Sequence, residues 1–98
     1  RIVFGFGLTY DTPGKKLRKV PEIVKEIISK VEKADLDRVH FKGFGDSSLD
    51  FEVVYYVDSQ DYNVYMDIQQ EINLQLKERI EKEKMEFAFP TRTVYLEK

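Results

Sequence analysis

Polar side chains that could do chemistry are few in this chain and lie far apart. His40 is the only histidine, and no Cys, Asp or Glu stands at metal-ligand spacing around it. Asp46, Ser47 and Ser48 combine a carboxylate with hydroxyl groups, but no general base accompanies them, and these are ordinary turn residues. The absence of cysteine excludes disulfides, thiolate metal sites and cysteine nucleophiles. We therefore expect no enzyme activity, no metal and no cofactor.

Two glycine-containing segments match nucleotide-binding or RNA-binding motifs only in part. Gly5-Phe6-Gly7 lacks the third glycine and the Lys-Ser/Thr pair of phosphate-binding loops. The segment 42–45, Lys-Gly-Phe-Gly, matches the start of the RNA-recognition signature, but Asp46 and Ser47 stand where an aromatic residue and Val are needed. The net charge of −2 also disfavours a nucleic-acid surface. We expect no nucleic-acid partner, and keep a ferredoxin-like module for RNA or a small regulatory ligand as the alternative function.

Hydrophobic periodicity predicts the elements that carry these residues. Alternation of apolar and polar or small side chains predicts strands over 1–10, 38–45 and 49–57, with a short strand at 85–89. The spacing of Tyr65, Ile68, Ile72, Leu76 and Ile80 predicts a helix that opens at 58–61 and runs to about Lys84.

The first helical segment contains a proline. Thr12 is expected to cap it, and Pro13 suits the first helical position. Pro21 removes a backbone hydrogen bond, which predicts a short helix over 14–19 and a main helix that begins near Pro21. The apolar stripe of this region is Leu17, Val20, Val24, Ile27, Ile28 and Val31.

The connection between the second and third strands can be inferred from parity. Phe41 and Phe51 lie on one face only if paired residue numbers have an even sum, which favours a loop of three or five residues. The same register places Lys42 opposite Glu52 or Asp50 on the outer face. Tyr56 is expected on that outer face, where it is available for a contact between subunits.

The order strand, helix, strand, strand, helix, strand predicts an α+β fold, the ferredoxin-like βαββαβ sandwich, over residues 1–89. Residues 90–98 then form a spare C-terminal strand, separated by Pro90 and rich in residues that favour extended backbone. An unpaired strand is a liability for a monomer, so it either returns to its own domain or pairs with other copies of the chain.

The chain is expected to be a fragment of a longer protein. Its 98 residues suffice for one domain, and it starts at Arg1 without an initiator Met. No apolar run approaches the roughly 20 residues that span a bilayer.

Three separated segments carry a family resemblance. They are Gly7-Leu8-Thr9-Tyr10-Asp11-Thr12-Pro13, the segment 41–51 (Phe-Lys-Gly-Phe-Gly-Asp-Ser-Ser-Leu-Asp-Phe), and the segment 87–96 (Phe-Ala-Phe-Pro-Thr-Arg-Thr-Val-Tyr-Leu). In this order and spacing the chain resembles the C-terminal cytoplasmic α/β domain of the small-conductance mechanosensitive channel (MscS) family.

The resemblance implies a function for the whole protein and a role for this part of it. Seven copies form a channel that releases ions and small solutes under membrane tension during osmotic downshock. Transmembrane helices lie upstream in the chain, and this domain lies at the cytoplasmic side of the inner membrane. This domain contributes a solute cage and subunit assembly without catalysis. The implied assembly residues are Phe89 and Pro90 as a hinge, and Thr93, Val94, Tyr95, Leu96 and Glu97 as a strand that joins six equivalents in a barrel.

Overall fold

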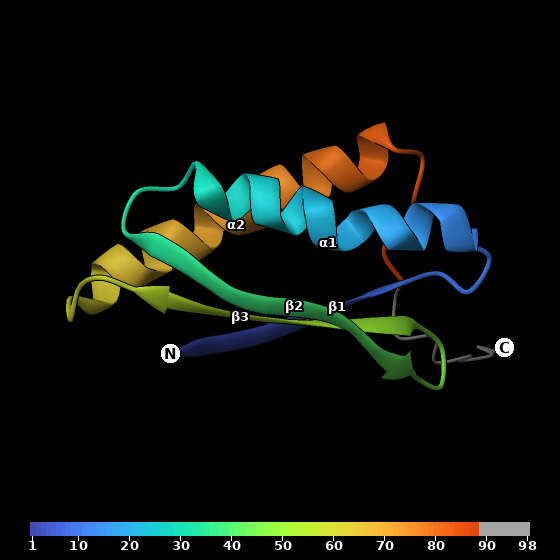
Figure 1. Ribbon diagram of the computed structural model, residues 1–98, viewed down its shortest axis with the longest axis horizontal. Coiled ribbons are helices and arrows are strands. Elements are labelled where there is room, and N and C mark those ends of the chain that lie inside the picture. Colours follow the sequence, from blue (N-terminus) through green and yellow to red (C-terminus); the bar gives the residue numbers. More distant parts are fainter. Residues whose placement is uncertain (89–98) are drawn as a thin grey trace, which may run out of the picture.

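A computed structural model describes residues 1–88 and shows two helices on one face of an antiparallel sheet (Figure 1). The elements are β1 (Ile2–Leu8), α1 (Gly14–Ser29), β2 (Ala34–Phe44), β3 (Leu49–Val57) and α2 (Tyr62–Lys82). The strands lie in the order β1-β3-β2. The predicted α+β class is confirmed, as are the bounds of β3.

The fourth predicted strand is present only as a short contact with β1. Leu8 and Phe87 form an isolated antiparallel bridge, so this segment extends the sheet on the free side of β1. That position is the one a ferredoxin-like sandwich gives to its last strand. Phe89, where the prediction ended this strand, lies outside the described residues.

The core lies between the sheet and the helices. The expected stripes of both helices supply it, apart from Tyr65, which is only partly buried, and together with Ile23, which the prediction missed. From the sheet come alternate residues of β3, all within a few per cent of complete burial: Leu49, Phe51, Val53 and Tyr55. The Tyr55 hydroxyl donates a 2.7 Å hydrogen bond to Gln69 Oε1, and burial raises the pKa of Tyr55 to about 12.

The predicted division of the first helix at Pro21 is wrong, because α1 is continuous from Gly14 to Ser29. A proline inside a helix costs about 3 kcal/mol. Val20 and Val24 are buried on either side of it, and each such burial stabilises by roughly 1.5–3 kcal/mol. Packing therefore outweighs the local cost.

The predicted cap of this helix is also wrong. Pro13 occupies the N-cap position without a side-chain cap hydrogen bond. The Thr12 hydroxyl instead donates 2.7 Å to the Thr9 carbonyl, which closes the preceding turn.

Strand β2 begins at Ala34, four residues before the predicted start at Arg38. A bulge between Leu36 and Arg38 interrupts the alternation, which hid this part of the strand from a period-two pattern.

Phe41 and Phe51 share one face of the sheet, as predicted, and are direct partners in the register, but the predicted loop length is wrong. Four residues, 45–48, connect the strands. A second bulge between Phe41 and Gly43 adds one residue to β2, so the sum of paired residue numbers is even at Phe41 and odd from Gly43 onward. A four-residue loop is therefore compatible with Phe41 and Phe51 on the same face of the sheet.

The second helix ends at Lys82, two residues before the predicted end, in a Schellman motif. Lys84 adopts a left-handed backbone (φ 64°), its N–H donates 2.9 Å to the Glu81 carbonyl, and the Met85 N–H donates 3.0 Å to the Ile80 carbonyl. This turn sends the chain back towards β1.

Candidate assembly site

Two of the segments that carry the family resemblance meet the described start of the third, residues 87–88, at one corner of the sheet. β1 ends there, the loop 45–48 turns there, and the chain from α2 returns there at residues 86–88. We call this place the exit corner, because the described chain ends at it (Figure 1).

Backbone hydrogen bonds fix the returning chain at the exit corner. The Thr9 N–H donates 3.1 Å to the Glu86 carbonyl, and the Ala88 N–H donates 2.9 Å to the Gly7 carbonyl. These bonds flank the bridge between Leu8 and Phe87. The described chain therefore ends at a defined point on the sheet edge.

The two loops of the exit corner are joined by a side chain. The Tyr10 hydroxyl donates to the Gly45 carbonyl, so the turn after β1 is tied to the β2–β3 loop 35 positions away. Inside that loop the Gly45 N–H donates 2.7 Å to the Ser48 carbonyl. Tyr10 was expected at the end of the first strand and belongs to one segment of the family resemblance, but this contact was not predicted.

Asp50 explains the glycines around the loop. Ser48 Oγ donates to Asp50 Oδ1 at 2.5 Å, which holds the carboxylate above Gly45. A Cβ on Gly45 would come within 2.6 Å of Asp50 Oδ2, and one on Gly7 within 2.6 Å of Ser48 Cβ. Gly43 has no such neighbour among the described atoms. The two glycines of the partial RNA-recognition match therefore differ: a side chain at Gly45 would meet Asp50, whereas one at Gly43 would meet open space.

Phenylalanines link the exit corner to the rest of the sheet. Phe87 meets Phe6 edge to face with ring centroids 5.9 Å apart, and Phe6 stacks on Phe51 at 5.3 Å. Phe41 continues the row by stacking on Phe51 at 5.2 Å and meeting Phe44 at 5.3 Å. Because aromatic pairs contribute about 0.5–1.5 kcal/mol beyond their buried area, this row couples the returning segment to all three strands.

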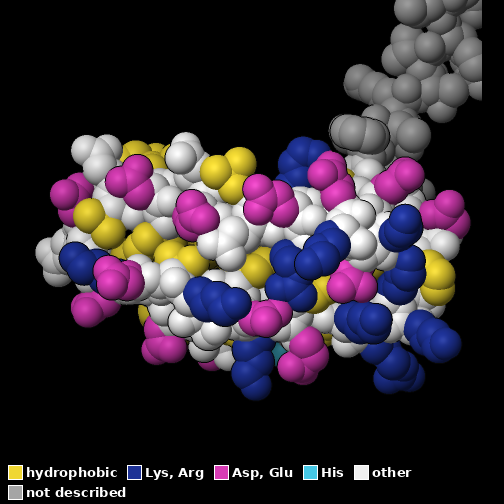
Figure 2. All heavy atoms as spheres, turned by 90° about the horizontal axis from the view of Figure 1, so that it is seen from above, with side chains coloured by type: hydrophobic (Ala, Val, Ile, Leu, Met, Phe, Trp, Pro, Cys, Tyr) yellow, Lys and Arg dark blue, Asp and Glu magenta, His cyan; other side chains and the backbone are white. Residues whose placement is uncertain are grey.

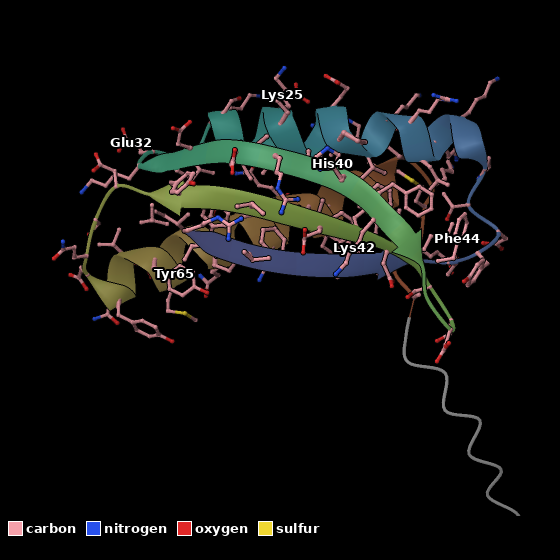
Figure 3. The ribbon with its side chains drawn as sticks, turned by 60° about the horizontal axis from the view of Figure 1, so that its bottom comes forward. Lys25, Glu32, His40, Lys42, Phe44 and Tyr65 are labelled. Atoms are coloured by element: carbon pink, nitrogen blue, oxygen red, sulfur yellow. The ribbon has the colours of Figure 1, made fainter. Side chains whose placement is uncertain are left out.

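The helix-free face of the sheet carries an ion-pair cluster around Glu52. Arg38 Nη1 lies 3.0 Å from Glu52 Oε1, and Lys42 Nζ lies 3.7 Å from Glu52 Oε2. The expected charge pair of Lys42 is present, but its expected register is wrong, because Lys42 lies in the bulge between Phe41 and Gly43 and has no direct partner on β3. The Arg38 hydrogen bond holds the pKa of the Glu52 carboxyl below its usual range, against a smaller opposing effect of burial. Figure 3 looks onto this face, with Lys42 near one end of it.

The residues considered for catalysis are not brought together. His40 is exposed on β2, opposite Glu52, while Asp46, Ser47 and Ser48 form the exposed to half-buried loop at the sheet's end. Among residues 1–88 no group of three potential ligands is placed to hold a metal ion.

The geometry also bears on RNA binding. Phe41 stacks on Phe51 on the side of the sheet that faces the helices, and Tyr56 is the one aromatic among the outward residues of β3, so the outward face of β3 has no row of aromatic side chains on which bases could stack. Asp50 and Glu52 share that outward face, so the described part of the sheet is an unfavourable surface for nucleic acid.

All seven residues predicted for assembly, Phe89, Pro90, Thr93, Val94, Tyr95, Leu96 and Glu97, lie outside the described residues. The exit corner is what the structure adds to that prediction. It was recognisable in the sequence only as three separate motifs.

None of the described helices is long and apolar enough to cross a bilayer.

Comparison with known proteins identifies the family. Residues 2–87 match the family described as "Mechanosensitive ion channel MscS, C-terminal". The chain is 47% identical over 100 residues to the small-conductance mechanosensitive channel MscMJ of Methanocaldococcus jannaschii, and this covers 100% of the chain and 28% of the relative.

Two further relatives show the range of the family. The large-conductance channel MscMJLR of the same organism is 42% identical over 97 residues, covering 94% of the chain and 27% of the relative. The low-conductance channel YnaI of Escherichia coli is 26% identical over 100 residues, covering 99% of the chain and 29% of the relative. The chain thus spans less than a third of the length of the curated relatives it matches. The fold, the motifs and these matches agree: the chain belongs to the MscS family of mechanosensitive channels, which are not enzymes, and corresponds to their C-terminal domain.

Proposed function

We propose that this chain is the cytoplasmic vestibule domain of a mechanosensitive channel at the cell (inner) membrane. In this proposal several copies assemble below a membrane-spanning part of the same protein and enclose a cage through which ions and small solutes leave under tension. Family membership supports the channel assignment, because the relatives are named as mechanosensitive channels. The names of these relatives span small, large and low conductance, so no conductance class is transferred to this chain.

The exit corner is the observation that carries the assembly role. Two backbone hydrogen bonds and the Phe6–Phe87 contact deliver the chain to a fixed position at Ala88. A segment that must meet the same segment of other copies gains from such a fixed start, since less conformational freedom is lost when it pairs.

We assign residues 1–89 to the vestibule domain and 90–98 to an assembly strand. Thr93, Val94, Tyr95 and Leu96 are residue types that favour strands, and Pro90 cannot continue the pairing of the segment before it. Seven copies, with one strand each, would close a small barrel and remove every unpaired edge.

Electrophysiology of the full-length protein tests the channel role. Reconstituted in liposomes and drawn into a patch pipette, it should pass current when suction raises membrane tension. Matched vesicles without the protein provide the control. Silence at every tension short of rupture would contradict the proposal.

A further inference from the structure

An exposed aromatic corner lies at the end of the molecule where α1 begins. Phe44 is 76% exposed and contacts Phe41, which lines an open groove between α1 and the outer edge of β2. Gly14, Leu17, Arg18 and Pro21 form the α1 side of this groove. We call Phe44 and the groove together the aromatic corner. Figure 3 shows Phe44 at the end of the sheet.

Several cationic side chains lie near the aromatic corner at the start of α1, where the helix dipole is unfavourable for positive charge. Lys15, Lys16, Arg18 and Lys19 occupy the first turns of α1, which has no acidic residue in its first turn. The positive end of the helix dipole disfavours cations in the first turn of a helix. Figure 2 shows Lys and Arg side chains gathered toward this end of the molecule.

Only half of these cations have a partner within the described chain. Lys16 Nζ donates 2.7 Å to the Glu83 carbonyl, and Lys19 Nζ lies 3.8 Å from Glu83 Oε1. Lys15 and Arg18 form no ion pair with any residue of 1–88. Arg18 lines the groove of the aromatic corner, Lys15 follows the groove residue Gly14, and both are available to an anionic partner.

A second surface of exposed aromatic and acidic side chains lies at the opposite end of the folded molecule, where α2 begins (Figure 1). Tyr62 is 69% exposed and Met66 is 43% exposed. Asp58 and Asp61 precede them, and Asp61 Oδ1 also accepts a 2.9 Å hydrogen bond from the Asn63 N–H as the helix cap. This acidic aromatic end, defined by Asp58, Asp61, Tyr62 and Met66, also exposes apolar side chains, and its named charges are opposite to those at the aromatic corner.

We propose that the aromatic corner of one copy binds the acidic aromatic end of the next copy. Charge selects this head-to-tail arrangement, since contact between two aromatic corners would bring two sets of cations together. Strand-to-strand addition at the β2 edge is disfavoured because the edge carries two bulges and charged residues such as Asp35, Asp37 and Lys42. Head-to-tail contacts between identical copies build a ring when the rotation closes.

This inference rests on the proposed function, because it names the surface by which copies of the vestibule domain touch. It is independent of the strand at 90–98, since both surfaces lie within residues 14–66. A ring therefore has two separate contacts, one lateral and one through the C-terminal segment.

Crosslinking of the full-length protein tests the contact. This chain has no cysteine, so Lys15→Cys and Asn63→Cys place one thiol beside each surface. A short bis-maleimide should convert the double variant into a ladder from dimer to complete ring, while each single variant stays monomeric. Dimers formed by the Lys15→Cys single variant would overturn the proposal, because they indicate contact between two identical ends.

Substitutions test which side chains carry the contact. Phe44→Ala should lower the crosslinking yield about tenfold, as expected for an aromatic anchor. Arg18→Asp should lower it about three- to fivefold, and adding Asp58→Arg should restore it. Lys82→Asp, the same charge change at the same end of the molecule, is the matched control and should leave the yield unchanged. Equal losses for Arg18→Asp and Lys82→Asp would refute the specific pairing.

The native mass of the same samples separates the two proposals. A multi-copy protein whose double variant does not crosslink overturns the head-to-tail contact and leaves the proposed function standing. A protein that is monomeric before crosslinking overturns both.

Discussion

Truncation of Phe87 should release the segment that leads out of the domain without unfolding the domain. Phe87 is half-buried, meets Phe6 edge to face at 5.9 Å, and belongs to an isolated bridge rather than to a continuous ladder. Full burial makes a Phe→Ala substitution cost about 3–5 kcal/mol, so a half-buried ring corresponds to about 2 kcal/mol. Because 1.4 kcal/mol is a factor of ten, local opening should become about 30-fold more frequent.

Amide hydrogen exchange measures this opening residue by residue. The amides of Thr9 and Ala88, which donate to Glu86 and Gly7, should exchange about 30-fold faster in Phe87→Ala. The amides of Phe51 and Val53 in the central strand should change much less. Phe44→Ala is the matched control, because its ring is 76% exposed and lies at the other end of the phenylalanine row. Uniform acceleration across β3 and the exit corner would refute the reasoning, since it would make Phe87 part of the global core.

Three further predictions concern the scaffold. Gly45→Ala should destabilise the domain by about 1–3 kcal/mol, because its Cβ would lie 2.6 Å from Asp50 Oδ2, whereas Gly43→Ala, with open space around it, should change the urea midpoint little. Pro21→Ala should raise the free energy of unfolding by up to about 3 kcal/mol by restoring a helix hydrogen bond, and a lower urea midpoint would contradict this account of α1. The pKa of Glu52 is lowered in the folded state, so its stabilising contribution is present above the ordinary glutamate range and is lost as the pH falls through the folded pKa. Between pH 6 and 3, the melting temperature of Glu52→Gln should therefore fall less than that of the wild type. Parallel curves of melting temperature against pH would contradict this.

Much of the fold could be predicted from the sequence because each element has a clear apolar period. The stripe of Ile68, Ile72, Leu76 and Ile80 and the common face of Phe41 and Phe51 follow from spacing alone, and the structure confirms both. The errors occur where two local rules compete. At Pro21 the tendency of proline to interrupt a helix is outweighed by the burial of apolar side chains on both sides of it. Around Leu36 and Lys42, bulges change the period of the strand.

The exit corner could be predicted only in part. Motif resemblance singled out the right segments, but their convergence depends on contacts between residues far apart in sequence. Tyr10 reaches Gly45, and Phe87 reaches Phe6, through the three-dimensional arrangement of the sheet. No local pattern encodes those partners. The predicted assembly strand stays a prediction, because its residues lie outside the described part of the chain.

Native mass spectrometry of the full-length protein, intact and without residues 90–98, tests the central proposal most directly. The intact protein should give one closed assembly of seven copies, and the truncated protein should dissociate into smaller species at a lower concentration of denaturant. Val94→Pro, which removes a backbone donor from the predicted strand, should reproduce the truncation. Identical copy number and identical resistance to dissociation in all three proteins would contradict the assignment of residues 90–98 as the assembly strand.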